Sequence, residues 1–455
     1  MDGFRGVWRT TPRRPSTGSP RLLHRPFPGR PWVIRHDPSP TITCGPPGRF
    51  RAPPIIERVT DLATRPAPPL LRRAAPALLG YAAVRVLGVV VLTLWSAARD
   101  KSALTLLSAR WDALWYTRVA ELGYGYEVRL PNGDVHSNLA FFPLLPWLER
   151  AVSAVTPLSY AHAGLAVGTL ASLGAAWGIF AVVDLVYGRR AGVCAVLLWA
   201  VLPVGIVQSM AYTEALFTAL AAWSLYAVLT GRWVTAGALA ALAGLTRPVG
   251  LAVVAAVWAA AITSYVRQRH LDPAPSSGRN RSPEASGGTP WWPRALGMLL
   301  APLGAGGYVL WVGERTGKGP LGYLDVQAGW RNGFDGGYAF ARFIADKFTS
   351  FPSALAGVGL IAGVAAVVWL YVICVRQGQP LPLLVYAGVV TALALCASSY
   401  FGSKPRLLMP AFPLLLPLAL ALARARTPRS AAVLGGVAAV SAVYGAFWLN
   451  GSGPP

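Results

Sequence analysis

Long runs of apolar residues, separated by short polar stretches, make up most of the chain after residue 75. A run of about 18 apolar residues is long enough to cross the hydrocarbon core of a bilayer as a helix. The pattern predicts about eleven such spans. They lie at 76–98, 161–187, 191–209, 213–230, 233–247, 249–266, 294–313, 353–375, 381–399, 407–424 and 430–449. We therefore expect an all-α polytopic membrane protein whose backbone polar groups are satisfied within helices.

Two of the predicted spans, 233–247 and 249–266, meet at Thr246-Arg247-Pro248. Proline removes a backbone hydrogen-bond donor and disfavours helical geometry at the residue before it. The sequence therefore leaves two alternatives open at this point: two separate short helices, or one broken element.

The composition agrees with a protein dissolved in lipid. Hydrophobic residues make up 54% of the chain, charged residues make up 13%, and the mean hydropathy is +0.46. Soluble domains carry roughly twice that charged fraction. The formal charge is +23, which on a soluble protein would suggest a nucleic-acid partner. Here the basic residues lie mainly in the N-terminal tail and in short loops, so the positive-inside bias and anionic membrane lipids explain them, and we expect no nucleic acid.

Residues 1–70 differ from the rest of the chain, because Arg, Pro, Gly and Ser dominate them. They contain no long apolar run, so they cannot bury enough apolar surface to offset the entropy cost of ordering the chain. We predict a disordered, basic cytoplasmic tail at 1–70, followed by a transmembrane domain at 76–450.

Orientation follows from the basic loops. With the tail in the cytoplasm, strict alternation places Arg189-Arg190, Arg232, Arg376 and the segment 267–293 inside, as the Lys/Arg rule requires. The long segments 99–160 and 314–352 then fall outside the cytoplasm. The apolar piece 141–147 within the first of them is interrupted by prolines and too short to span, so we expect it to lie in the interface or to re-enter.

No familiar metal or nucleotide motif is present. The cysteines Cys44, Cys194, Cys374 and Cys396 lack the spacing of a metal site or a disulfide framework. The histidines His136 and His162 are isolated in the sequence. We expect no cofactor, and the sequence leaves metal dependence open.

Two acids, Asp112 and Glu214, lie near the predicted outer surface, where ionisable groups are candidates for function. Asp112 follows Arg110-Trp111 among aromatic residues typical of an interfacial belt, so an anchor role is the alternative. Glu214 begins a predicted span, where the helix dipole favours a carboxylate without any catalytic role.

Three cations are predicted on the same face: Arg247, Lys404 and Arg406. A guanidinium at that level binds a lipid phosphate through two parallel hydrogen bonds. The alternative is ordinary snorkelling of a long basic side chain to the interface.

These residues, taken in order, resemble the bacterial relatives of the GPI mannosyltransferase II (PIG-V-like) family within the GT-C glycosyltransferases. The resemblance covers about 76–425 and is carried by Arg110-Trp111-Asp112, Trp115-Tyr116, Gly123-Tyr124, Phe141-Phe142-Pro143-Leu144, Tyr212-Thr213-Glu214 and Arg247-Pro248-Val249-Gly250. No single motif is specific; the ordered set is more so. The resemblance implies a GT-C-like helical bundle with a large first external loop. It also implies inverting transfer of a sugar, mannose above all, from a polyprenyl-phosphate donor outside the cytoplasm.

The resemblance places Asp112 at the position of the catalytic base, because GT-C enzymes carry an acidic residue in the first large external loop. Glu214 is then expected to orient the sugar or the base. Cations stabilise a phosphate leaving group, so Arg247, Lys404 and Arg406 are the candidates for the donor phosphate. Trp111 and Tyr212 are candidates for stacking on a sugar ring, with packing as the alternative. The acceptor is left open as a glycolipid, a glycan or a protein.

Two other function classes compete with an enzyme. A transporter or flippase of a lipid-linked saccharide would show internal repeats or paired broken helices, and the sequence shows one break, near Arg247, and no evident repeat. A scaffold without catalysis gives no reason for Asp112 and Glu214 to share one face.

Overall fold

The computed structural model describes residues 69–271, 291–451 and 453. The predicted tail at 1–70 therefore lies almost wholly outside the described residues, as does most of the predicted loop 267–293. The helices are α2 (Leu70–Ala97), α3 (Ala103–Ser108), α4 (Asp112–Leu122), α5 (Leu144–Val155), α6 (Tyr160–Tyr187), α7 (Arg189–Ala200), α8 (Thr213–Leu229), α9 (Trp233–Gly244), α10 (Leu251–Leu271), α11 (Trp292–Leu300), α12 (Leu303–Arg315), α13 (Gly322–Gly329), α14 (Tyr338–Asp346), α15 (Ser353–Arg376), α16 (Leu381–Cys396), α17 (Lys404–Leu408), α18 (Leu416–Arg424) and α19 (Thr427–Leu449).

Short 3-10 turns and strands complete the described part of the fold. The turns are η1 (Asn138–Ala140), η2 (Gly205–Ser209), η3 (Pro248–Gly250), η5 (Gly319–Leu321), η6 (Lys347–Thr349), η7 (Phe401–Ser403) and η8 (Phe412–Leu415). Strands β1 (Glu127–Arg129) and β2 (Val135–Ser137) pair antiparallel, with Val128 opposite His136. Strands β3 (Gly333–Phe334) and β4 (Ala397–Ser398) form a second antiparallel pair.

The prediction of a helical, multi-pass membrane protein is confirmed, but the count of about eleven spans is not. Six helices of the described residues are long and apolar enough to cross a membrane, and a seventh span is counted if one bent pair is included. The six are Leu70–Ala97, Tyr160–Tyr187, Pro248–Arg269, Trp292–Arg315, Ser353–Arg376 and Thr427–Leu449. The bent pair joins Phe401–Leu408 to Phe412–Arg424 at an angle of 76°.

The remaining predicted spans are apolar but short, because the chain breaks within them. The run 191–209 holds only α7, of 12 residues, before Pro203 and the turn η2 interrupt it. Helix α9 also has 12 residues and ends before Arg247-Pro248. Helices α8 and α16 have 17 and 16 residues. Hydropathy located these segments but did not predict how long the unbroken helix in each segment would be.

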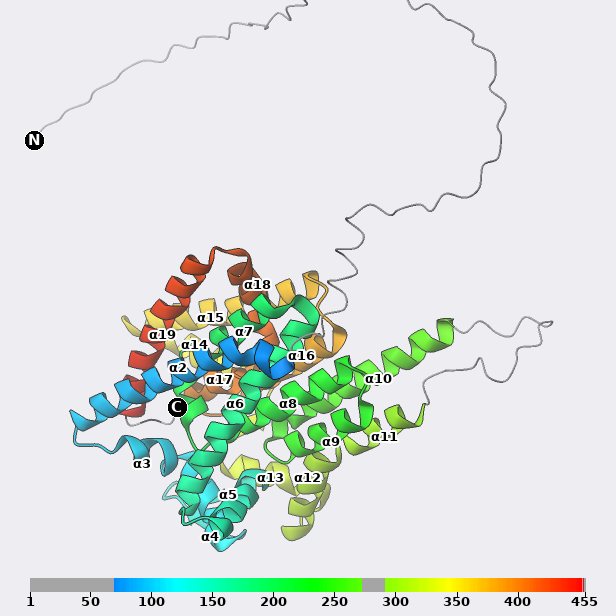
Figure 1. Ribbon diagram of the computed structural model, residues 1–455. Helices are drawn as coiled ribbons and strands as arrows, with labels where there is room; N and C mark the ends of the chain where they lie inside the picture. The colour runs from blue at the N-terminus through cyan, green and yellow to red at the C-terminus, as the bar shows by residue number, and fades with distance from the viewer. Residues whose placement is uncertain (1–68, 272–290, 452, 454–455) are drawn as a thin grey trace, which may run out of the picture. The chain divides into compact units, whose positions relative to one another are not determined.

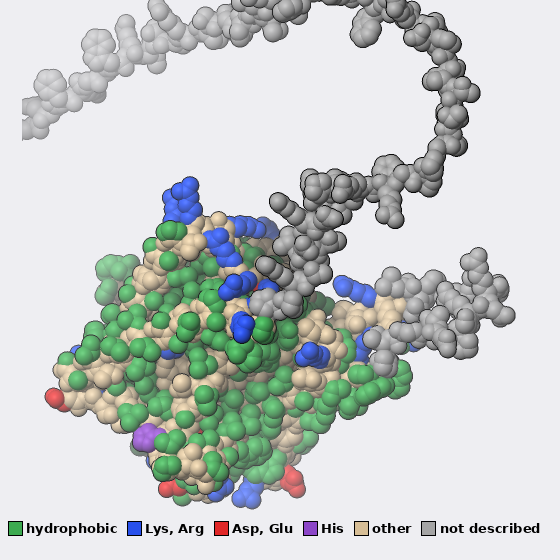
Figure 2. Space-filling view, viewed as in Figure 1, with side chains coloured by type: hydrophobic (Ala, Val, Ile, Leu, Met, Phe, Trp, Pro, Cys, Tyr) green, Lys and Arg blue, Asp and Glu red, His purple; other side chains and the backbone are tan. Residues whose placement is uncertain are grey.

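One end of the helical bundle is basic. Arg73 at the start of α2 pairs with Asp184 near the end of α6. Arg189 donates to the carbonyl of Arg73, and Arg190 donates to the carbonyl of Ala425 between α18 and α19. Lys and Arg side chains gather in Figure 2 around the start of α2 and the junction of α18 and α19 (labelled in Figure 1). The loops that we assigned to the cytoplasm from their charge therefore include several that meet at one end.

Helices α4, α5 and α13 lie away from that end, at the lower edge of Figure 1. They belong to the two segments that we predicted outside the cytoplasm, and these segments are joined: the indole of Trp330 donates to the carbonyl of Ser137 at 3.0 Å, and Arg331 pairs with Asp134 at 2.6 Å. The proline-interrupted piece leads into the short helix α5, whose first N–H donates to the carbonyl of Leu245 at 3.0 Å. Its place relative to a bilayer stays a prediction.

A close approach of α6 fixes the segment that leads into α8. A Cβ atom at Gly168 would lie 2.6 Å from the carbonyl oxygen of Met210, so only glycine fits this contact without a shift. Residues 211–213 follow directly and are buried. The start of α8, which carries Glu214, is therefore held against α6 by backbone packing.

Candidate active site

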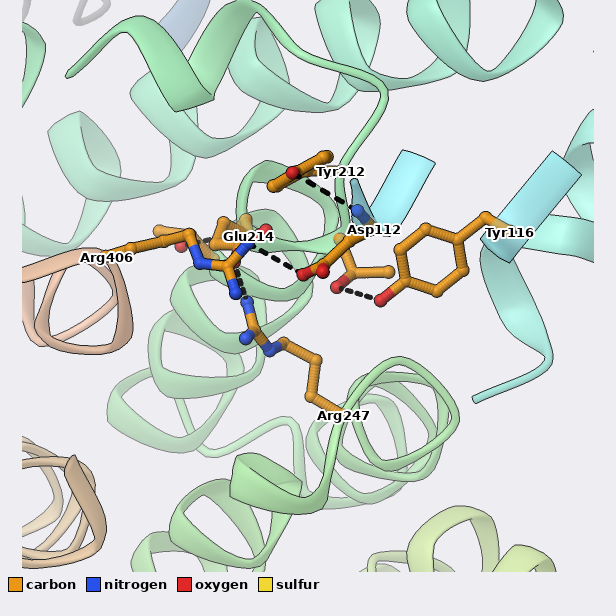
Figure 3. A network of polar contacts seen from close by, with 8 residues as sticks. Asp112, Tyr116, Tyr212, Glu214, Arg247 and Arg406 are labelled. Atoms are coloured by element: carbon orange, nitrogen blue, oxygen red, sulfur yellow. Dashed lines mark hydrogen bonds and ion pairs between the residues drawn. The ribbon is translucent and has the colours of Figure 1, made fainter. Parts of the chain in front are cut away.

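Four charged side chains from distant parts of the sequence meet in one cluster (Figure 3). Asp112 is the first residue of α4 and Glu214 is the second residue of α8. Arg247 precedes the turn η3, and Arg406 lies in the short helix α17. Sequence reasoning placed all four on one face, and the structure brings all four together. We call them the charged cluster.

Asp112 and Arg406 form the outer pair of the charged cluster. Nη1 of Arg406 donates to Oδ2 of Asp112 at 2.7 Å. The Asp112 side chain is 29% exposed, whereas that of Arg406 is 9% exposed. The carboxylate therefore remains accessible to a molecule from outside, while the guanidinium reaches it from within the protein.

Glu214 forms the inner part of the charged cluster, with 1% of its side chain exposed. Its Oε1 faces two guanidinium groups, Nη1 of Arg247 and Nε of Arg406, the latter at 3.3 Å. Both contacts are ion pairs. Two acids and two guanidiniums cancel in charge, which is how buried ions are tolerated in a site of low dielectric constant.

Tyr212 packs against this cluster, as in the alternative to stacking on a sugar. Its hydroxyl accepts the backbone N–H of Asp112 at 3.3 Å. Its ring lies 5.1 Å from the guanidinium carbon of Arg406, within the range of a cation–π contact. The side chain is buried, so neither ring face is open to a ligand in this structure.

Trp111 holds an unusual backbone conformation directly before Asp112. Its φ is +54°, in the left-handed region that favours glycine. Such a residue costs on the order of 1–3 kcal/mol, and strain of this kind is concentrated at functional sites. The Trp111 ring is half-buried under the guanidinium of Arg110, 4.2 Å away. Trp111 therefore keeps its candidacy for sugar contact, and its backbone sets where α4 begins.

Lys404 lies outside the charged cluster, and its assignment to the donor phosphate stays a prediction. Its buried ammonium donates to the carbonyls of Ala394 and Ala397, at the C-terminal end of α16. It also lies 4.9 Å from the ring centre of Phe340. A cation at this position satisfies carbonyls that the helix end leaves without partners. Lys404 therefore fastens α17 to α16.

Sequence reasoning missed a second hydrogen bond beside the charged cluster. The hydroxyls of Tyr116 and Thr213 lie 3.0 Å apart and link α4 to the start of α8. Burial raises the pKa of the Tyr116 phenol, so this group stays neutral. The spacing of Asp112 and Tyr116, four residues apart on one helix, was the signal that both face the same way.

An aromatic group extends from the charged cluster toward the β1–β2 hairpin. Trp115 stacks on Phe141 at 5.6 Å and meets the edge of Trp330 at 4.9 Å. His136 stacks on Trp330 at 4.0 Å, so it is isolated in sequence but packed in the fold. This group joins α4 to the strand hairpin and to α13.

The part of the chain that the structure describes shows no obvious set of metal ligands. No group of three or more His, Cys, Asp or Glu side chains there is placed to hold an ion.

No protein-family model matches the chain, and no curated protein matches it. Among solved structures, the chain is similar to ArnT from Cupriavidus metallidurans in the apo state, with 18% identity and a TM-score of 0.45. It is also similar to the same protein bound to undecaprenyl phosphate, with 17% identity and a TM-score of 0.44. Each match covers 77% of this chain and 61% of the other. The PIG-V-like resemblance stays a prediction.

Proposed function

We propose that the chain is a membrane glycosyltransferase of the GT-C type. It moves a sugar from a polyprenyl-phosphate donor to an acceptor hydroxyl on the non-cytoplasmic side. The observation that carries the proposal is one contact: a partly exposed carboxylate, Asp112, is bonded to the mostly buried guanidinium of Arg406. A base and a phosphate ligand are the two groups that this transfer needs side by side.

Asp112 acts as the base of the reaction. It takes the proton of the acceptor hydroxyl while the acceptor oxygen bonds to the anomeric carbon of the sugar. The bond from that carbon to the phosphate oxygen breaks, and the polyprenyl phosphate leaves with the electron pair. Attack opposite the leaving group inverts the anomeric configuration, as in other single-displacement sugar transfers.

Arg406 and Arg247 hold the donor phosphate. Both guanidiniums face Oε1 of Glu214 and come from segments at backbone breaks, η3 for Arg247 and α17 for Arg406. Glu214, almost fully buried, orients the two guanidiniums and has no access to an acceptor. It is therefore a positioning residue, and Asp112 is the catalytic one.

The identity of the substrates goes beyond this geometry. The PIG-V-like resemblance suggests mannose as the sugar, with a glycolipid, a glycan or a protein as the acceptor. The orientation rests on the charge of the loops. In a background without the four native cysteines, Asn132→Cys and Tyr338→Cys should react with an impermeant reagent from outside, and Gln377→Cys should not. The reverse pattern would put the site in the cytoplasm.

A flippase of a lipid-linked saccharide is the second candidate. One observation favours it: two broken elements meet at the charged cluster, the 76° bend after α17 and the break at Arg247-Pro248. Paired broken helices around a binding site are typical of transporters. A flippase, however, has no use for a proton acceptor at the site.

The test is a reconstitution that separates the two functions. The purified full-length chain in liposomes receives radiolabelled polyprenyl-phosphate mannose and a membrane extract as the acceptor source. We expect the label in a product other than the donor, and Asp112→Asn should abolish it. If the intact donor crosses the bilayer without sugar transfer, at the same rate in the wild type and in Asp112→Asn, the result would contradict the enzyme and support the flippase.

A further inference from the structure

We infer that Arg406 is shared between the base and the leaving group. In the free protein it holds Asp112, and in the donor complex it passes to the phosphate, so that Asp112 becomes free to accept a proton only when the donor is bound. This inference rests on the proposed function and adds an order to it: the donor binds before the base can work.

The guanidinium of Arg406 makes one contact inside the protein and one that a ligand can replace. Its Nε faces the buried carboxylate of Glu214 at 3.3 Å, and its guanidinium lies over the Tyr212 ring. Its Nη1 donates to the partly exposed Oδ2 of Asp112 at 2.7 Å. An anion that takes the place of Asp112 at this guanidinium leaves the contacts to Glu214 and Tyr212 in place.

Asp112 depends on this one cation. Among the described residues, Arg406 is the only cationic side chain that pairs with its carboxylate. The other contact at Asp112 is the backbone N–H, which donates to Tyr212. Oδ2 of Asp112 is therefore engaged with Nη1 of Arg406 in the free protein, and it becomes available to an acceptor hydroxyl when that contact is released.

The charge balance of the reaction explains why the same guanidinium serves both groups. Transfer removes one negative charge from Asp112, which becomes protonated, and adds one to the phosphate, which becomes a monoester. A guanidinium within reach of both follows that charge from one group to the other. An interaction that grows as charge moves to the leaving group lowers the barrier, whereas one made equally to donor and transition state does not.

The same balance predicts competition between Asp112 and the phosphate. The four groups of the charged cluster already cancel, so a donor phosphate brings an uncompensated negative charge. It binds at Nη1 only by displacing Asp112. Removing the Asp112 charge should therefore tighten binding of the phosphate while it stops the chemistry. A carboxylate that simply contacts the acceptor would give no such tightening.

The test measures binding of undecaprenyl phosphate to the full-length chain in lipid nanodiscs. The variants are Asp112→Asn, Arg406→Gln and the double variant, with Asp325→Asn as the matched control. Asp325 pairs with Lys318 at 3.4 Å in an exposed ion pair outside the charged cluster. We expect Asp112→Asn to tighten binding about fivefold or more, a coupling of ordinary size for linked sites. Arg406→Gln should weaken binding, and the double variant should bind like Arg406→Gln alone, since the effect of Asp112 acts through that guanidinium.

Each result decides between two claims. Binding to the wild type that Asp112→Asn leaves unchanged or weakens overturns the shared role of Arg406 and leaves the proposed function standing. Tightening that persists in the double variant also overturns it, because the effect then bypasses Arg406. Absence of binding to every variant overturns the donor class, and with it both claims. Tightening in Asp325→Asn as well would mean a general effect of net charge and would also contradict the inference.

Discussion

The two ends of the helical bundle use the same residue types in different ways. At the basic end, Arg73 binds both carboxylate oxygens of Asp184, at 2.7 and 2.9 Å, and 34% of its side chain remains exposed. At the site end, the guanidiniums of Arg247 and Arg406 lie almost inside the protein and share one carboxylate, that of Glu214. The basic end pairs one cation with one acid, and the site end interlocks four groups.

This difference separates an anchor from a site. The pair at the basic end is partly screened by water, because the Arg73 side chain is 34% exposed although that of Asp184 is only 7% exposed. Buried ions must first lose their hydration, so a buried cluster is a poor way to gain stability and is retained for another reason. Charge alone could not distinguish an anchor from a site in the sequence, because Arg73 and Arg406 both stand near the ends of apolar runs. The structure distinguishes them, because the site arginines are buried and share one carboxylate.

The largest expected effect follows from removing the shared acid. Glu214→Gln leaves two mostly buried guanidiniums without their common partner, which should cost about 3–5 kcal/mol of stability. Asp184→Asn, the matched change at the basic end, should cost less than Glu214→Gln, because its partner Arg73 reaches water and is hydrated without the acid. Thermal unfolding of both variants in one detergent compares the two ends. Equal losses would show that the charged cluster is no different in kind from an anchor.

A third acid, Glu149, sharpens the comparison because it is buried without a cation. Its side chain is fully buried in α5, neither carboxyl oxygen has a hydrogen-bond partner among the described residues, and burial raises its pKa from 4.5 to about 9. Between those two values the folded state holds a proton that the unfolded state has lost, so this group lowers stability as pH rises through that window. Glu149→Gln carries no charge and removes the effect.

We therefore expect Glu149→Gln to melt close to the wild type at pH 5 and several degrees above it at pH 8, as a gain of about 1–2 kcal/mol would produce. Thermal unfolding at the two pH values measures the difference. If the melting temperatures of Glu149→Gln and the wild type differ by the same amount at pH 5 and pH 8, Glu149 has a partner, which would contradict the geometry.

The smallest effect is expected at the rim of the basic end. Arg190 donates to the carbonyl of Ala425 from an exposed position. Arg190→Ala should change stability by no more than about 0.5 kcal/mol, as surface substitutions usually do, and transfer activity should be unchanged. A loss comparable to that of Glu214→Gln would mean that the two ends are coupled through the bundle.

The sequence predicted the membrane class and the four residues of the charged cluster for physical reasons. Apolar runs and loop charges assign residues to a side of the membrane, and few acids fall on the site side, so Asp112, Glu214, Arg247 and Arg406 could be named together. Lys404 shows the limit, because it stands two residues before Arg406 in one short helix and yet turns to the carbonyls of α16. Side-chain direction within a broken segment depends on packing that spacing does not record.

The count of about eleven spans is not confirmed, for a similar reason. Hydropathy sums over a window and is insensitive to a break such as the one after α7 at Pro203, which divides an apolar run into a short helix and a 3-10 turn. The role of Tyr212 could not be chosen from the sequence, because an aromatic residue next to a candidate acid suits stacking on a sugar and packing equally well. Its side chain is buried in the structure, which favours packing.

The most direct test of the account is the single-turnover rate of sugar transfer by Asp112→Asn with the donor saturating. Asn keeps the shape and hydrogen bonding of the side chain but cannot take the acceptor proton as a carboxylate does. We predict a fall in rate on the order of a hundredfold to ten-thousandfold, in protein that is folded and that binds the donor phosphate at least as tightly as the wild type. Transfer at a near-normal rate by Asp112→Asn would contradict the assignment of Asp112 as the base.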